Sequence, residues 1–467
     1  MLSLMMKYVC QLILFSFFVQ DSFASSLAGI IAKYPELRDN NVSIEILDTA
    51  TGKSVYSKNP ELALNPASAL KILISATAFE TLGLARTFKT TVKKSGSTLC
   101  LVGGGDPSLV QESLKELAKL TQQLLALNPG VLTELVVDET LFPAEKPFDQ
   151  TFAADEDRAF TADIGSLSVN FNSIAVRAKA TKIGEAADII LTPDIPEMKV
   201  KNKTVTASSG GKKDIGISIN LTPNGKEYVV NVDGKVSNKE DFFTLYASIP
   251  SEPALVAGYI FRQALKLEGI SIPTVAKKPC PVSATDVISW SSKPLANIVQ
   301  DMNIYSNNFI AETLLRNVGE TNDKTSGLSK VRQFLASRGL TAPTTVLDNA
   351  SGLSRNNRIS SSTLAKAFAN SMNDFEFGPE FLTSMSINGR TGTMRNRMRG
   401  KPLQEPEDKS VIRAKSGTLK GVVSLVGRAR TNNKDYVFSF LFNTFKYSTS
   451  ELQGLENDML RALLEIR

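Results

Sequence analysis

The chain of 467 residues contains no histidine. Catalytic relays of the Ser-His-Asp and Cys-His types need an imidazole as the base, so this protein can use neither of them. Zinc sites that need a histidine ligand are excluded for the same reason. If the protein carries out nucleophilic catalysis, another side chain must accept the proton of the nucleophile.

Cysteine is scarce, with three residues in the whole chain. Cys10 lies ahead of most of the N-terminal apolar run, where a lipid-anchor cysteine is not expected. Cys100 and Cys280 remain, and two cysteines often pair in an oxidising compartment. The sequence does not give the geometry that a disulfide requires, so a disulfide and two buried thiols both stay open.

Long apolar runs are absent after the N-terminus. At the N-terminus, Lys7 is followed by the apolar run Tyr8–Val19 and then by Ser22 and Ala24, which are small residues at positions −3 and −1 before Ser25. This pattern predicts a cleaved signal peptide over residues 1–24 and export to the periplasm. An uncleaved membrane anchor is the alternative, but the run is short for a membrane span.

Composition indicates a globular protein with a full core, because 42% of the residues are hydrophobic and 21% are charged. The length suggests two to four domains. The net charge of +6 allows weak attraction to anionic polymers or a peripheral membrane association. An ordinary mixed surface is the favoured interpretation, and the lack of basic runs with interleaved aromatic residues disfavours nucleic-acid binding.

A candidate for the missing base is the lysine of Ser68-Ala-Leu-Lys71. Asn65 as N-cap and Pro66 at the first position predict a helix that runs to about Gly83. Residues i and i+3 share one face of a helix, so Ser68 and Lys71 are expected to be neighbours. Burial and a nearby second cation would keep the lysine amine partly neutral, as a base requires.

Enzymes that use Ser-x-x-Lys need two further elements, Ser-x-Asn and then Lys-Ser/Thr-Gly. Lys-Ser-Gly occurs at Lys94, which precedes every Ser-x-Asn, and at Lys415, inside an apolar run that predicts a strand. Among the Ser-x-Asn matches, Ser306-Asn307-Asn308 lies between two helical segments, 295–302 and 309–316. The other matches lie in predicted strands or turns, at Ser168, Ser218, Ser354, Ser371 and Ser386.

The segment Trp290–Asn308 resembles the middle of the class C low-molecular-mass penicillin-binding proteins, the D-alanyl-D-alanine carboxypeptidase/endopeptidase family. Several other stretches resemble the same family, in the right order along the mature chain. They are Gly103–Pro107, Leu167–Asn172, Leu347–Arg355 and Gly392–Arg397.

The resemblance implies a serine peptidase that cleaves D-Ala-D-Ala termini or cross-links of peptidoglycan stem peptides, needs no metal or other cofactor, and is inhibited covalently by β-lactams. Ser68 would be the nucleophile, Lys71 its base and Ser306 the proton relay, with the substrate held by Asn308 and Lys415. Further substrate contacts would come from Ser416, Gly417 and Thr418, and the N–H groups of Ser68 and Thr418 would form the oxyanion hole.

Asp163 precedes Leu167–Asn172. In some members of this family an aspartate there contacts the amine of a diamino acid in the substrate. A loop-capping aspartate is the equally weighted alternative.

The expected fold class is α+β, with a penicillin-binding/β-lactamase-like catalytic domain of an antiparallel sheet flanked by helices. A large insertion would interrupt this domain, because the stretch from Ser68 to Ser306 is longer than a compact domain needs. Residues 25–87 and 287–467 are predicted to form the catalytic domain. Residues 88–286 would form one or two β-rich or mixed domains, with a change of character near residue 178.

Two other functions stay open: a serine β-lactamase, and an inactive cell-wall binding protein. The sequence does not decide between carboxypeptidase and endopeptidase, and it gives neither the oligomeric state, the role of the insertion nor the preferred peptidoglycan chemotype. Because no side chain here has an unperturbed pKa near 6.5, a pH–rate limb in that range would belong to a shifted lysine or carboxylate, with Lys71 as the first candidate.

Overall fold

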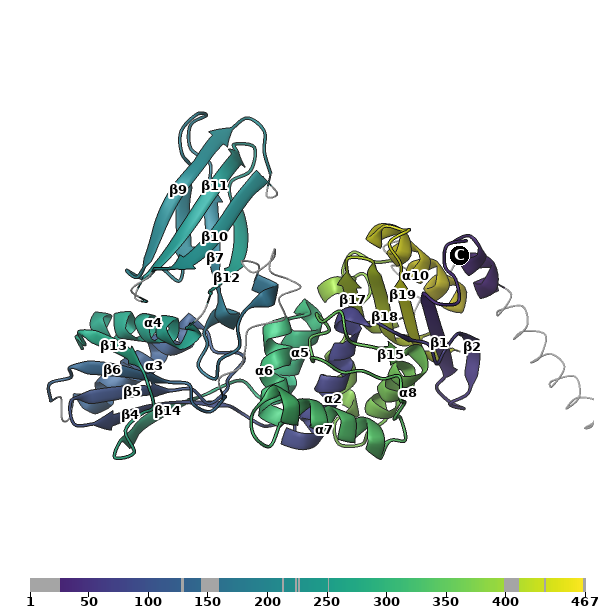
Figure 1. Cartoon of the computed structure of the whole chain (residues 1–467), viewed down its shortest axis with the longest axis horizontal. Coiled ribbons are helices and arrows are strands. Elements are labelled where there is room, and N and C mark those ends of the chain that lie inside the picture. The colour runs from purple at the N-terminus through teal and green to yellow at the C-terminus, as the bar shows by residue number, and fades with distance from the viewer. Residues whose placement is uncertain are drawn as a thin grey trace, which may run out of the picture. The chain divides into compact units, whose positions relative to one another are not determined.

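The computed structural model describes residues 26–126, 130–143, 159–211, 214–222, 225, 227–250, 252–398, 411–431 and 434–464. The predicted signal peptide lies outside these ranges. So do Asn432 and Asn433 of the segment 431–434, for which the sequence between two apolar runs predicts a hairpin turn. The chain forms two compact units (Figure 1). The first takes its described residues from Met1–Leu84, Val299–Asn307 and Gly327–Arg467, and the second from Ala85–Ile298 and Asn308–Ser326.

The first unit is built on a six-stranded sheet in which every neighbouring pair is antiparallel. Two of these strands come from residues 43–56, whose alternating apolar residues on either side of a turn at Thr49–Lys53 predict a hairpin. In the order of the sheet, the strands are β16 (Ser386–Ile387), β17 (Val411–Leu419), β18 (Val422–Arg430), β19 (Asp435–Asn443), β1 (Val42–Asp48) and β2 (Ser54–Lys58). A small ladder pairs β3 (Ala63–Leu64) with β15 (Ile359–Ser360).

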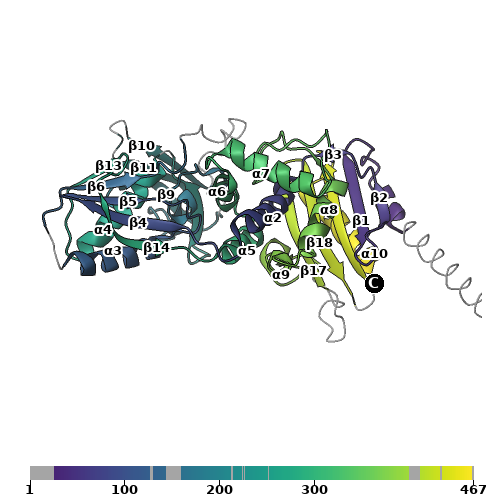
Figure 2. The ribbon, with the colours of Figure 1, turned by 90° about the horizontal axis from the view of Figure 1, so that it is seen from below.

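Helices cover both faces of this sheet, because alternate residues of its strands are buried on opposite sides (Figure 2). Ile44 and Ile46 share a core with α10 (Thr449–Leu464). On the other face, the hydroxyl of Ser43 bonds Ser361 at the start of α8 (Ser361–Met372). The leucine and methionine residues of α10 recur at helical spacing, which predicts a helix that packs on its own sheet, and the structure confirms this because they are buried in the shared core.

Other helices of the chain are α2 (Lys71–Leu82), α5 (Leu295–Tyr305), α6 (Asn308–Val318), α7 (Lys324–Ser337) and α9 (Gly378–Thr383). No helix within the described ranges is both long and apolar enough to cross a membrane.

The second unit contains a mixed five-stranded sheet that packs against α3 (Gln111–Leu125) and α4 (Pro253–Leu267). Its strands, in order, are β13 (Thr274–Lys277), β6 (Glu134–Asp138), β5 (Thr98–Val102), β4 (Lys89–Ser95) and β14 (Thr285–Ser291). A disulfide joins Cys100 of β5 to Cys280, so the two cysteines that the sequence left undecided are paired.

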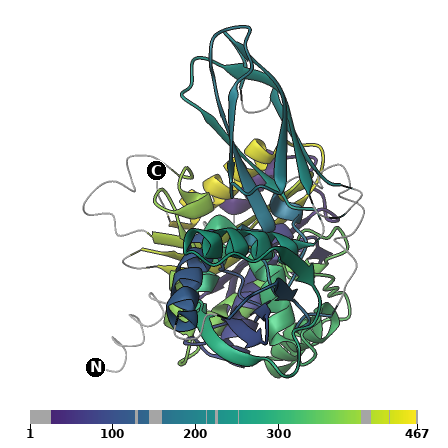
Figure 3. The same ribbon diagram turned by 90° about the vertical axis from the view of Figure 1, so that its left-hand side faces the viewer.

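Two three-stranded sheets complete the second unit, and their inner faces belong to one apolar core. One sheet has the order β10 (Ile215–Leu221), β11 (Tyr228–Ser237), β9 (Met198–Ala207). The other has the order β12 (Phe243–Ser248), β7 (Ser173–Lys179), β8 (Asp188–Thr192). We call this pair of sheets the sandwich; its strands stand at the top of Figure 3.

Candidate active site

Ser68 lies in a tight 3₁₀ turn, η1 (Ala67–Leu70), directly before α2. The prediction of an α-helix that begins at Pro66 is therefore wrong at its first turn. The reason is local: Ala67 has φ of 44°, which a regular right-handed helix does not allow. The side chain of Asn65 still caps this turn, since its Oδ1 accepts a hydrogen bond from the N–H of Ala67 at 2.9 Å. Strain at such a residue is typical of functional sites.

Lys71 is within hydrogen-bond distance of Ser68, as the spacing predicts. The two atoms Lys71 Nζ and Ser68 Oγ are 2.9 Å apart, and the lysine side chain has no exposed surface. The backbone carbonyl of Ser351 accepts from Lys71 Nζ at 2.6 Å and from Ser68 Oγ at 3.3 Å. One carbonyl thus positions both members of the pair.

The loop that supplies this carbonyl fits only because residue 352 is glycine. Gly352 has φ of 82°, and a Cβ added there would lie 1.9 Å from the carbonyl oxygen of Ala67 and 3.0 Å from the nitrogen of Ser68. Sequence reasoning quoted this loop within Leu347–Arg355 but gave it no role. Its signal was the Ser-Gly pair, a place where only glycine permits close approach of two backbones.

Ser306 and Lys415 form a second contact of the same kind. Lys415 Nζ donates to Ser306 Oγ at 2.8 Å and to the carbonyl of Ser416 at 2.8 Å. Lys415 is completely buried, and burial lowers its pKa to about 7 because the charged form loses hydration. Ser306 joins α5 to α6 in a left-handed conformation, with φ of 55°.

The strand of Lys415 lies directly against the turn of Ser68. A Cβ added at Gly417 would come within 2.6 Å of the carbonyl oxygen of Pro66 and 2.8 Å of the nitrogen of Ala69. The hydroxyl of Ser424, on the neighbouring strand β18, donates to that same carbonyl of Pro66. These contacts bring Ser68, Lys71, Ser306 and Lys415 into one site of the first unit.

The same stretch of β17 has a free edge. β16 pairs with Arg413 and Ala414 only, so the described part of the chain places no strand on that side of residues 415–419. Thr418 is exposed there, and the Ser416 hydroxyl donates to the Thr393 hydroxyl at 2.7 Å. An open strand edge can pair with an extended peptide through backbone hydrogen bonds.

The remaining predicted site residues, Asn308 and Asp163, lie in the second unit. Asn308 starts α6 and is almost fully buried, and its Nδ2 donates to the carbonyl of Phe160 at 3.1 Å. Phe160 belongs to the short turn η3 (Ala159–Thr161) that precedes Asp163. The backbone carbonyl of Asp163 in turn accepts from Asn172 at 3.0 Å. Asn308 therefore binds the segment that carries Asp163.

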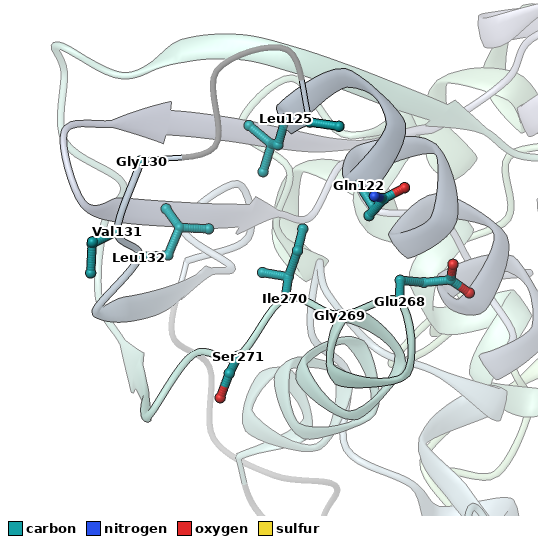
Figure 4. A pocket seen from close by; sticks show the side chains of 10 residues that line it. Gln122, Leu125, Gly130, Val131, Leu132, Glu268, Gly269, Ile270 and Ser271 are labelled. Carbon is teal, nitrogen blue, oxygen red and sulfur yellow. The ribbon is translucent and has the colours of Figure 1, made fainter.

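A separate pocket in the second unit does not resemble a catalytic site. It has a volume of about 330 Å³ and lies by the C-terminal ends of α3 and α4 (Figure 4). Its wall includes Leu125, Leu132 and Ile270, and Glu268 is the one ionisable side chain among the described residues that line it. Ser68, Lys71, Ser306 and Lys415 all belong to the other unit.

Comparison with known proteins gives consistent matches over almost the whole chain. Residues 23–464 match the model of the D-Ala-D-Ala carboxypeptidase 3 (S13) family. The D-alanyl-D-alanine carboxypeptidase of Actinomadura sp. is 28% identical over 443 residues, which cover 88% of this chain and 79% of that protein. The D-alanyl-D-alanine carboxypeptidase DacB of Haemophilus influenzae is 26% identical over 358 residues, or 75% of this chain and 72% of that protein.

A solved structure has the same fold. The crystal structure of penicillin binding protein 4 from Haemophilus influenzae superposes with a TM-score of 0.76 at 20% identity, covering 94% of this chain and 98% of that chain. Together with the antiparallel sheet and its flanking helices, this likeness confirms the predicted α+β fold class.

Proposed function

Because the chain belongs to the D-Ala-D-Ala carboxypeptidase 3 (S13) family and is thus a serine-type carboxypeptidase, we propose that it hydrolyses D-alanyl bonds of peptidoglycan stem peptides through an acyl-enzyme on Ser68. The observation that carries this proposal is the pair of buried lysines, each bonded to one serine: Lys71 to Ser68 and Lys415 to Ser306.

In the acylation step, Ser68 Oγ attacks the carbonyl carbon of the penultimate D-alanine while its proton passes to the neutral amine of Lys71. The tetrahedral intermediate collapses, and the C–N bond to the terminal D-alanine breaks. The leaving amine takes a proton from the hydroxyl of Ser306, which relays the proton that Lys71 received from Ser68, so Lys71 is neutral again and Lys415 keeps its charge. Water then hydrolyses the ester and regenerates Ser68. The N–H groups of Ser68 and Thr418 stabilise the oxyanion; one such donor is worth about 3 kcal/mol.

The substrate peptide would lie along the open edge of β17, with its terminal carboxylate near Lys415, Ser416 and Thr418. Gly417 keeps the strand close to the nucleophile. Asn308 would hold the acyl side of the peptide. Asp163 would bind the amine of a diamino acid, and the bond from Asn308 to Phe160 supports the idea that both act on one ligand.

A peptidase of cell-wall peptides works outside the cytoplasm, and we propose the periplasm, reached by cleavage after residue 24. The disulfide between Cys100 and Cys280 supports an oxidising compartment. We also propose that residues 25–87 and 287–467 form the catalytic domain and that residues 88–286 are an insertion into it.

The decisive experiment uses penicillin as a covalent probe. We expect a labelled penicillin to acylate the folded protein, and peptide mapping by mass spectrometry to find the adduct on the peptide that contains Ser68. A heat-denatured sample is the control and should stay unlabelled. A folded sample without an adduct on that peptide would overturn the mechanism. A long-lived adduct supports a peptidase, and fast turnover supports a β-lactamase instead.

The rate constant for acylation should depend on pH through the protonation state of Lys415. Because burial lowers its pKa to about 7, the lysine is cationic below that pH and neutral above it. Only the cation attracts a ligand carboxylate, so the acylation rate constant should fall as pH rises through about 7. Stopped-flow acylation with penicillin G measures this limb. A penicillin methyl ester lacks the carboxylate and should not show it; an identical limb with both compounds would contradict the assignment.

A further inference from the structure

The sandwich of the second unit has one outer face that is unlike the other. Along the sheet β10-β11-β9, most outward residues are polar or charged, including Lys199, Lys201 and Lys203 of the edge strand β9, although Val205 of the same strand is 45% exposed. Lysines on an edge strand are a common protection against unwanted strand pairing. The lysines of that face are therefore accounted for by protection of the edge strand.

The outer face of the sheet β12-β7-β8 instead carries large apolar side chains in solvent. Tyr246 is 58% exposed, Ile190 is 51% exposed and Phe242, directly before β12, is 48% exposed. Inward neighbours on the same strands are buried in the core, Leu191 beside Ile190 and Ala247 beside Tyr246, so alternation sends these apolar side chains outward. Exposed apolar groups gathered on one face mark a binding surface.

The strand register places polar groups between these apolar ones. Tyr246 lies opposite Ala175, which lies opposite Thr192, so a small residue separates the ring from a hydroxyl. In the next row, Thr244 lies opposite Arg177, which lies opposite Ile190. With strands about 4.8 Å apart and rows about 6.7 Å apart, the face measures roughly 10 by 13 Å. We call it the platform.

Arg177 at the centre of the platform is held by a ring and not by a carboxylate. Its guanidinium lies 4.6 Å from the centroid of Phe242. In the part of the chain that the structure describes, no acidic group forms an ion pair with Arg177, and no group hydrogen-bonds the hydroxyl of Tyr246. A stacked guanidinium keeps its N–H edge available for an acceptor on a ligand.

We propose that the platform binds a glycan strand of N-acetylated amino sugars. A pyranose ring offers a face of polarised C–H groups that fits the negative face of an aromatic ring, here Tyr246. Its acetamido carbonyl is an acceptor for Arg177, and its hydroxyls suit Thr192 and Thr244. The identity of this polymer rests on the proposed function, because such a strand is the backbone to which D-alanyl stem peptides are attached.

Two other partners fit the platform less well. An anionic membrane surface is attracted by clusters of several cations, whereas here Asp188 lies opposite Lys179 in the outermost row and offsets its charge. A protein partner would not need the alternation of ring, hydroxyl and guanidinium along one flat sheet.

The test uses the full chain and peptide-free glycan strands, prepared from peptidoglycan with an amidase, in isothermal titration calorimetry. We expect Tyr246→Ala and Arg177→Ala each to weaken binding about ten-fold, the loss typical of a central anchor. Tyr246→Phe keeps the ring and should bind as the wild type does. Val205→Ala and Lys201→Ala, on the outer face of the other sheet, are the matched controls and should change nothing.

Three results would overturn the proposal. The first is wild-type protein that does not bind the strands. The second is binding of the strands by the Tyr246→Ala and Arg177→Ala variants with the same affinity as the wild type. The third is that these two variants lose binding to vesicles of phosphatidylethanolamine and phosphatidylglycerol but still bind the glycan strands. That result would assign the platform to a membrane. The strands contain no D-alanyl bond, so this outcome is independent of penicillin labelling at Ser68, which tests the proposed function.

Discussion

Replacement of Lys71 by arginine is expected to lower the rate constant for acylation of Ser68 by about 10²–10⁴-fold, the usual contribution of a positioned general base. Arginine supplies a permanent positive charge at this position but cannot give up its proton at any pH at which the protein is folded. It therefore separates the role of Lys71 as a base from a role as a fixed cation. The measurement is the rate of adduct formation with a labelled penicillin.

The buried position of Lys71 requires a control for folding. Lys53→Arg, in the exposed turn between β1 and β2, makes the same chemical change without touching the site. We expect it to be acylated at the wild-type rate. Thermal unfolding of both variants would detect a general loss of structure. If folded Lys71→Arg protein reacted as fast as the wild type, another group would have to be the base.

The second large effect is expected from Gly352→Ala. The added methyl group would lie 1.9 Å from the carbonyl oxygen of Ala67, so the loop or the turn of Ser68 must move. The same movement displaces the Ser351 carbonyl that holds Lys71. A displacement of about 1 Å at a catalytic group can cost 10²-fold, so we expect at least about that loss in the acylation rate constant.

Gly339→Ala is the matched control for this variant. Gly339 also has a positive φ, 66°, but a Cβ there meets nothing within 4 Å. Both variants bear the backbone strain of alanine in a left-handed conformation, about 1–2 kcal/mol, and only Gly352→Ala bears the collision. Equal acylation rates for the two variants would show that the loop does not position the nucleophile.

Local patterns in the sequence predicted most of the elements that carry the site. The spacing of Ser68 and Lys71 determined their contact, because three residues of a helical turn return the chain to the same side. The leucine stripe of α10 and the hairpin of β1 and β2 were predictable from periodicity for a similar reason. Each of these features depends on residues close together in the chain.

The parts that were not predicted depend on residues far apart. Nothing local to Ser351 indicates that its carbonyl meets a lysine 280 residues away. The pKa of Lys415 depends on its complete burial, which follows from the packing of β17 and not from its neighbours in the chain. The disulfide likewise required knowledge that β5 and the segment of Cys280 approach each other.

The disulfide closes a covalent ring that contains the whole sandwich, since Cys100 and Cys280 are separated by 180 residues along the chain. A single cut by a protease anywhere inside that ring leaves both fragments joined. The strands of the five-stranded sheet at the base of the ring then remain tethered, so the ends cannot diffuse apart before they pair again. A protease cut within residues 101–279 is thus tolerated while the disulfide is intact, and that tolerance ends when the disulfide is reduced.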